Sequence, residues 1–124
     1  MKHPWHATAH DAQGAPLPQG RRSAEILRHG SLEVRWYAPR GEDPQTPHDR
    51  DELYVVAAGR AAFVRGAERV SVGANDVLFV PAGMSHRFEE MSADFATWVV
   101  FYGATGGERE LPFFDRSARR RQPA

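Results

Sequence analysis

The chain has 124 residues, of which 41% are apolar and 26% charged, and this composition fits one globular domain with one core. Its 16 basic and 16 acidic residues balance. The excess basic charge of a nucleic-acid-binding surface is therefore missing, and no nucleic-acid partner is expected. The sequence contains no cysteine, which excludes disulfides, thiolate metal sites and thiol nucleophiles. By this reasoning any metal would be held by His, Asp or Glu.

Residues 1–22 are expected to form an N-terminal arm, because prolines and glycines interrupt any regular pattern there. The arm carries His3, His6 and His10, which are interpreted as side chains of a solvated tail rather than as a metal site. It shows no signal-peptide pattern, and no apolar run approaches the roughly 20 residues of a membrane span. The expectation is a cytoplasmic protein with no membrane partner.

Residues 23–102 carry the strand signals. Residues 31–37 alternate between apolar and polar side chains, which predicts a strand with Leu32, Val34 and Trp36 on its one buried face. Further strand signals cover residues 26–27, 53–58, 60–64, 68–72, 77–80, 86–89 and 95–102. Many short strands separated by turn residues predict an all-β sandwich or closed barrel. Residues 103–124 are expected to form a basic C-terminal tail.

Two histidines lie at the margins of apolar strand signals. His48 precedes one strand and is followed four residues later by Glu52. His86 follows another strand and the turn that Pro81 and Gly83 predict. Two imidazoles and one carboxylate can hold a divalent metal if the fold brings them together. The alternative is that both histidines are partly buried and hydrogen-bonded to backbone or carboxylate groups.

The first of these stretches resembles a motif of the cupins, small double-stranded β-helix barrels. That motif has a His-x-His pair, a glutamate about four residues on, and a glycine seven residues after the glutamate. His48, Glu52 and Gly59 match the second histidine, the glutamate and the glycine, whereas Thr46 stands at the first histidine. A fold that satisfies the motif must bend at residues 49–50, because four residues of straight strand would separate His48 from Glu52.

The second stretch resembles the other cupin motif, which has a Gly-Asp turn, an apolar strand, Pro-x-Gly and a histidine. Asp76, Pro81, Gly83 and His86 match it, and Asn75 replaces the expected glycine. Asn75 tolerates a positive φ better than most residues, so the turn is still expected. Together the motifs imply an RmlC-like jelly-roll barrel of the small cupin-2 type over residues 23–102. They also imply a divalent metal ion, with Fe, Mn, Zn or Ni all open, held by His48, Glu52 and His86.

The resemblance implies the fold better than the reaction, because the cupins include both enzymes and non-catalytic domains. One hypothesis is a metal-dependent enzyme of dioxygenase or isomerase type that acts on a small molecule inside the barrel. The other is a non-catalytic module that binds a small ligand or metal, such as a sensory domain. No catalytic residue is assigned. Trp36, Tyr54 and Phe88 are candidates for a ligand-binding pocket wall, although core packing would also explain them.

An assembly is also predicted. Alternation places Val55 and Ala57 on the outer face of the strand that begins near Glu52. Such apolar outer surface exceeds what a small barrel can hide inside itself, and a two-fold dimer is the commonest way to cover it. The expectation is a homodimer in which the N-terminal arm crosses to the partner.

Overall fold

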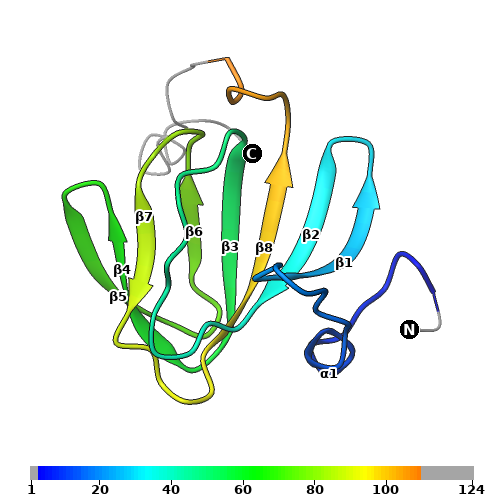
Figure 1. The fold of residues 1–124 in the computed structure, drawn as a ribbon, viewed down its shortest axis with the longest axis horizontal. Helices are drawn as coiled ribbons and strands as arrows, with labels where there is room; N and C mark the ends of the chain where they lie inside the picture. Colours follow the sequence, from blue (N-terminus) through cyan, green and yellow to red (C-terminus); the bar gives the residue numbers. More distant parts are fainter. Residues whose placement is uncertain (1–2, 110–124) are drawn as a thin grey trace, which may run out of the picture.

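The computed structural model describes residues 3–109, and its strands form two antiparallel sheets (Figure 1). The five-stranded sheet has the order β1 (Ala24–His29), β2 (Leu32–Tyr37), β8 (Ala96–Tyr102), β3 (Asp51–Ala58) and β6 (Val77–Val80). The three-stranded sheet has the order β5 (Glu68–Gly73), β4 (Arg60–Arg65) and β7 (His86–Glu89). The predicted all-β jelly-roll architecture is confirmed, because chain neighbours such as β6 and β7 pair in different sheets.

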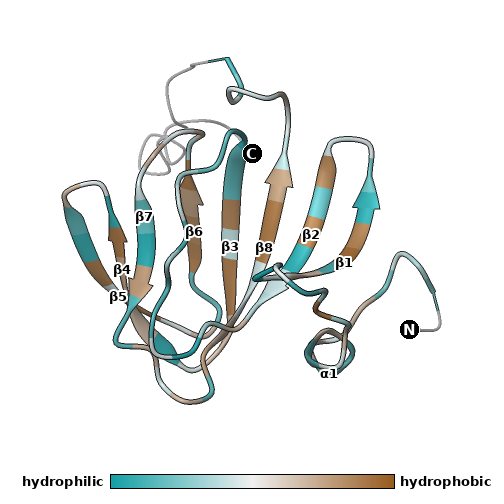
Figure 2. Cartoon of the chain, in the orientation of Figure 1, coloured by the Kyte–Doolittle hydropathy of each residue, from teal (hydrophilic) through white to brown (hydrophobic). Residues whose placement is uncertain are grey.

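β3 shows the predicted two-residue alternation most clearly. Glu52, Tyr54 and Val56 are fully buried on the inner face, whereas Leu53 and Val55 on the outer face are only partly covered. Tyr54 and Val56 belong to the main core cluster, to which β4, β7 and β8 also contribute. Glu52 is the second residue of β3, and the start of that strand is teal in Figure 2. The strand therefore carries a carboxylate to the edge of the core.

β2 departs from the expectation of one buried face. Its apolar face carries Val34 and Trp36, as predicted, but Glu33 and Arg35 on the opposite face are also buried, with 7% and 4% of their surfaces exposed. The prediction of a single buried face was therefore wrong for this strand. Charged side chains can be buried here because they pair with one another, Arg35 Nη1 lying 2.6 Å from Glu33 Oε1.

Part of the predicted N-terminal arm forms the helix α1 (Ala9–Gln13), which Thr8 caps through a reciprocal pair of hydrogen bonds with Asp11. Ala12 of this helix is buried in a second apolar cluster with Ile26 and Trp36. Ala57 also packs against this cluster, so the chain itself covers part of the surface on which the homodimer prediction rested. The homodimer stays a prediction.

The structure does not describe the C-terminal tail beyond Arg109, so most of the basic segment predicted there lies outside the described residues. Within residues 3–109 no helix has the length and apolarity needed to cross a membrane. The turn before β6 is formed as expected: Asn75 adopts a φ of 73° and donates its backbone N–H to the Val56 carbonyl at 2.8 Å. An asparagine therefore replaces the glycine of the motif without loss of the turn.

Candidate metal centre

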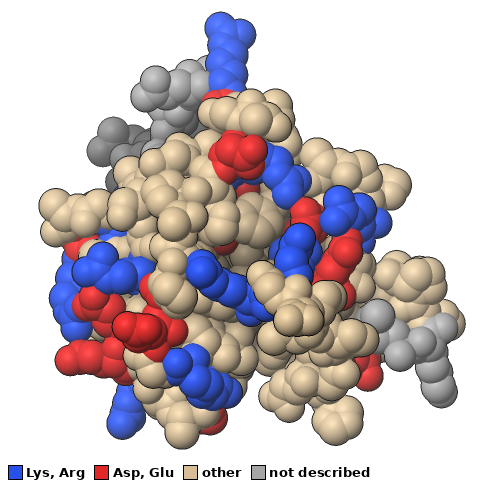
Figure 3. All heavy atoms as spheres, in the orientation of Figure 1, with Lys and Arg blue, Asp and Glu red and all other residues tan. Residues whose placement is uncertain are grey.

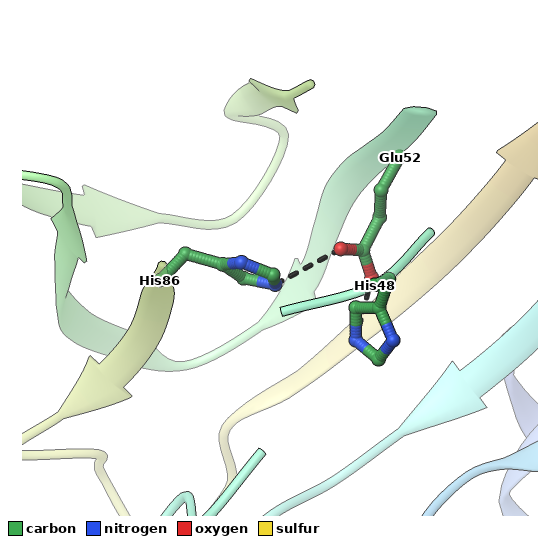
Figure 4. Close-up of side chains that lie close together, drawn as sticks. All are labelled: His48, Glu52 and His86. Atoms are coloured by element: carbon green, nitrogen blue, oxygen red, sulfur yellow. Dashed lines mark ion pairs between the residues drawn. The ribbon is translucent and has the colours of Figure 1, made fainter. Parts of the chain in front are cut away.

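The side chains of His48, Glu52 and His86 point toward one another at one end of the barrel (Figure 4). One potential ligand atom from each residue can be chosen so that all three lie within 4.8 Å of one another. His86 Nε2 is 2.9 Å from Glu52 Oε1, and His48 Nε2 is 3.9 Å from Glu52 Oε2. The structure thus brings together the three residues that the sequence predicts as metal ligands.

Different parts of the chain position these side chains. Glu52 is the second residue of β3, His86 is the first of β7, and His48 lies in the segment that precedes β3. The chain bends at residues 49–50, as the spacing of His48 and Glu52 requires. The backbone N–H of Gly83 donates to the His48 carbonyl at 2.7 Å, so the turn of the second motif holds the histidine of the first.

Asp51 strengthens this connection. Its Oδ1 accepts a hydrogen bond from the Ala82 backbone at 2.9 Å, and its Oδ2 accepts one from the Glu108 backbone at 2.8 Å. The buried carboxylate therefore joins the start of β3 to the turn before β7 and to the chain that follows β8. A charge-assisted bond to backbone N–H groups is strong enough to fix loops in place.

His86 is held at both ring nitrogens. Its Nδ1 lies 2.9 Å from the Met84 carbonyl, and its Nε2 lies 3.1 Å from the Tyr54 hydroxyl and close to Glu52. Burial alone would lower the pKa of His86, but its contacts with Glu52 and the Met84 carbonyl outweigh burial and raise that pKa. The carbonyl contact suits an Nδ1–H donor, which leaves Nε2 as the atom that faces the other two candidate ligands.

Glu52 provides the test of whether this set of residues fits a metal ion. Its side chain is 1% exposed, and Oε1 has no well-oriented hydrogen bond from any residue the structure describes, although His86 Nε2 is nearby. A buried carboxylate oxygen without a hydrogen bond is costly, and buried charges are normally paired or bound to a metal. The donor set of two imidazoles and one carboxylate suits a divalent transition metal. The residues therefore fit the ion that the motifs imply.

A cavity of about 250 Å³ is lined by His48 and Glu52, and Tyr54, Val99 and Phe101 contribute to its wall. Of the predicted wall residues, Tyr54 lines this cavity, Phe88 packs behind it in the main core, and Trp36 lies in the second cluster against Trp98. Burial and the neighbouring Glu52 raise the pKa of Tyr54 well above its ordinary value. Its phenol is therefore a hydrogen-bond donor rather than a base.

Charged side chains surround the mouth of the cavity. Glu33 and Arg50 both line it, and Arg50 Nη2 lies 2.8 Å from Glu33 Oε2. Arg35 and Arg28 contact the other oxygen of Glu33 at 2.6 and 3.5 Å. Positive and negative side chains also lie intermixed over the face of the molecule in Figure 3, rather than gathered by sign. Opposite charges thus lie close together both on this face of the molecule and around Glu33 at the cavity.

Glu33 should make stability depend on pH. Burial alone would raise its pKa, but hydrogen bonds from Arg50 and Arg35 outweigh burial, and the pKa is lowered from 4.5. A lowered pKa in the folded state stabilises the protein above the unfolded pKa, and this contribution disappears as pH falls through the folded pKa. In metal-free protein, Glu33→Gln should therefore reduce the free energy of unfolding by about 1–3 kcal/mol at neutral pH.

Denaturant unfolding at neutral pH and at about pH 3.5 measures this effect, and the difference between Glu33→Gln and wild type should shrink at the lower pH. Glu68→Gln is the matched control, because the Glu68 side chain is 80% exposed and its ion pair with Arg65 is long, at 3.8 Å. Its effect should stay within about 0.5 kcal/mol at both pH values. An equal loss for Glu33→Gln at the two pH values would contradict the assigned role of the carboxylate.

Sequence reasoning missed the hydrogen-bonded residues that stand behind the site. Asp43 is buried and accepts hydrogen bonds from the Tyr37 hydroxyl, the Phe88 backbone and the Gln45 side chain. Gln45 in turn contacts His48 and Tyr54. Asp43 and Gln45 lie in the proline-containing segment between β2 and β3, where no periodicity fixes the direction of a side chain. The sequence feature that could have indicated Gln45 is its position directly before Thr46, which stands at the first histidine of the motif.

An antiparallel jelly-roll barrel with imidazole and carboxylate groups at one end defines a small β-barrel protein with a candidate divalent metal site. The sequence model of the Cupin domain family matches residues 34–102. That match covers more than half of the chain, and the protein belongs to the cupin family. The predicted family is thereby confirmed.

A relative in Streptomyces coelicolor, the uncharacterized protein SCO3923, is 40% identical over 79 residues, which are 62% of this chain and 75% of the relative. Solved structures share the fold at lower identity. A Rhizobium leguminosarum protein of unknown function has a TM-score of 0.62 at 22% identity, covering 80% of this chain and 96% of that one. A Cupin 2 conserved barrel domain protein from Salinispora arenicola has a TM-score of 0.61 at 22% identity, covering 80% of this chain and 89% of that one. A predicted oxalate decarboxylase from Thermotoga maritima has a TM-score of 0.53 at 22% identity, covering 64% of this chain and 77% of that one.

Proposed function

We propose that this cupin binds a divalent metal ion through His48, Glu52 and His86 and acts on a small molecule in the adjoining cavity. The observation that carries the proposal is Glu52 Oε1, which is buried, receives no well-oriented hydrogen bond from residues 3–109 and faces an imidazole nitrogen. Such a carboxylate is stabilised by a cation, and imidazole and carboxylate groups suit Fe, Mn, Zn or Ni. Among the described residues, the imidazole of His86 is the group that faces this oxygen, at 2.9 Å.

A bound divalent ion would supply Lewis-acid or redox chemistry to a molecule in the cavity. Residues of this chain hold the three candidate ligands in position. The Met84 carbonyl fixes the ring of His86, Gly83 fixes the backbone of His48, and the β3 ladder fixes Glu52. Aromatic groups of Tyr54 and Phe101 limit the cavity on the apolar side. The pKa of Tyr54 is raised well above its ordinary value, so its phenol keeps its proton at neutral pH.

We infer a metal-dependent enzyme of dioxygenase or isomerase type as the first reading of this site. The alternative is a non-catalytic module that binds a small ligand or metal. The raised pKa of Tyr54 supports this alternative, because it removes that residue as a general base beside the site. One similar fold is a predicted oxalate decarboxylase, so small carboxylic acids are suitable first compounds to test as substrates or ligands.

Elemental analysis after removal and reloading of metal tests the binding, and we expect about one divalent ion per chain. A screen of small carboxylic acids with and without O₂, using the reloaded protein, then separates the two readings. Turnover supports the enzyme, whereas ligand binding without turnover supports the module. Failure of Fe, Mn, Zn and Ni to bind stoichiometrically would reject the metal site itself and leave two buried, hydrogen-bonded histidines.

A further inference from the structure

Gln45 places an amide oxygen beside the candidate metal ligands. The residue lies in the segment between β2 and β3 and is half-buried at the wall of the cavity. Its Oε1 is 3.2 Å from His48 Nε2 and accepts a hydrogen bond from the Tyr54 hydroxyl at 3.1 Å. The same hydroxyl lies 3.1 Å from His86 Nε2. The amide oxygen therefore belongs to the cluster formed by His48, Glu52, Tyr54 and His86.

Asp43 determines which end of the Gln45 amide faces this cluster. Gln45 Nε2 donates to Asp43 Oδ2 at 2.7 Å. An ionised carboxylate only accepts hydrogen bonds, so the amide NH₂ must face Asp43 and the carbonyl oxygen must face His48. Asp43 cannot easily turn away, because it is buried and also accepts hydrogen bonds from the Phe88 backbone and the Tyr37 hydroxyl. The oxygen is thus presented to the cluster by a buried support.

We propose that Gln45 Oε1 is a further protein ligand of the divalent ion, beside His48, Glu52 and His86. The inference deepens the proposed function and rests on it. Adjacent ligands of an octahedral ion with bonds of about 2.1 Å lie about 3.0 Å apart, and Gln45 Oε1 lies 3.2 Å from His48 Nε2. Hydrogen bonds to metal-bound groups commonly fix such ligands in place, and Asp43 provides one here.

In the sequence, this proposed ligand lies one residue before the position of the motif's first histidine. Thr46 occupies the motif position, and its side chain is exposed. An amide oxygen is a harder ligand than imidazole and carries no charge. With Gln45 the site offers two nitrogens and two oxygens, which favours Mn²⁺ or Fe²⁺ over softer ions.

Mn²⁺ is the probe for the test, with affinity measured by calorimetry and coordinated water counted by EPR line broadening in ¹⁷O-enriched water. Removal of a protein ligand opens a position that water fills, whereas loss of a mere support for His48 leaves the count of coordinated water unchanged. Gln45→Ala should weaken Mn²⁺ binding at least about tenfold and add one coordinated water. Gln45→Ser, which stays polar but is too short to reach the ion, should do the same.

Thr46→Ala is the matched control, because it changes the neighbouring exposed residue at the wall of the same cavity. It should alter neither the affinity nor the water count. Circular dichroism establishes that each variant is folded. If wild type binds Mn²⁺ and both Gln45 variants keep the same number of coordinated waters as wild type, Gln45 is not a ligand. That result refutes this inference and leaves the proposed metal site intact. If wild type fails to bind any divalent ion, the proposed metal site falls with it.

Discussion

Glu52→Gln should abolish stoichiometric metal binding and leave the fold intact. The side chain is 1% exposed and stands at the start of a strand paired on both sides, so an amide of the same shape fits without a cavity. The substitution removes the only negative charge among the three predicted ligands. A neutral amide cannot compensate the charge of a divalent ion in a buried place, and affinity should fall by at least about 100-fold.

The measurement is metal content by elemental analysis after reloading, followed by titration calorimetry on the apo-proteins. Thr46→Ala serves again as the control, because Thr46 lines the same cavity and is exposed, and we expect it to retain the metal. His86→Gln should lose metal as Glu52→Gln does, since His86 offers its Nε2 to the same point. Full retention of metal by Glu52→Gln would show that the carboxylate is not a ligand.

The strand pattern predicted the position of these residues well, and the physical reason is the two-residue period. Because Tyr54 and Val56 are apolar and share a face with Glu52, burial of the strand core carried the carboxylate to the inside. The spacing between His48 and Glu52 likewise required the bend at residues 49–50 that the structure contains. Local geometry thus sufficed wherever a regular strand determined the direction of the side chain.

The pattern failed where two faces of a strand competed or where no strand was present. In β2 the alternation of apolar and polar residues correctly placed Trp36 on one face and Glu33 and Arg35 on the other. It could not show that the rest of the protein buries both faces. Trp36 is covered in part by α1, a helix of five residues, which is too short to produce a recognisable helical period. Gln45 was not among the predicted metal ligands, because only His, Asp and Glu were expected to hold a metal, although amide oxygen also binds metals.

Gly59→Ala should be strongly destabilising, and the reason lies in two separable effects. Gly59 has a φ of +73°, which costs other residues about 1–2 kcal/mol. A Cβ there would also lie 2.7 Å from the backbone nitrogen and Cα of Phe95 and 2.5 Å from Ser92 Oγ. Phe95 is a fully buried core residue, so its backbone can move only if the core repacks. Strain and overpacking together should reduce the free energy of unfolding by about 2–5 kcal/mol.

Gly66→Ala in the turn between β4 and β5 separates the two effects. Its φ is +57°, and a Cβ there would meet nothing within 4 Å, so only the backbone strain applies. We expect this control to lose about 1–2 kcal/mol in denaturant unfolding, and Gly59→Ala to lose about 1–3 kcal/mol more. The excess measures the close approach of the connection between β3 and β4 to the segment that leads into β8, which explains a glycine at this motif position. Equal losses in the two variants would show that the contact with Phe95 relaxes freely and that backbone conformation alone requires the glycine.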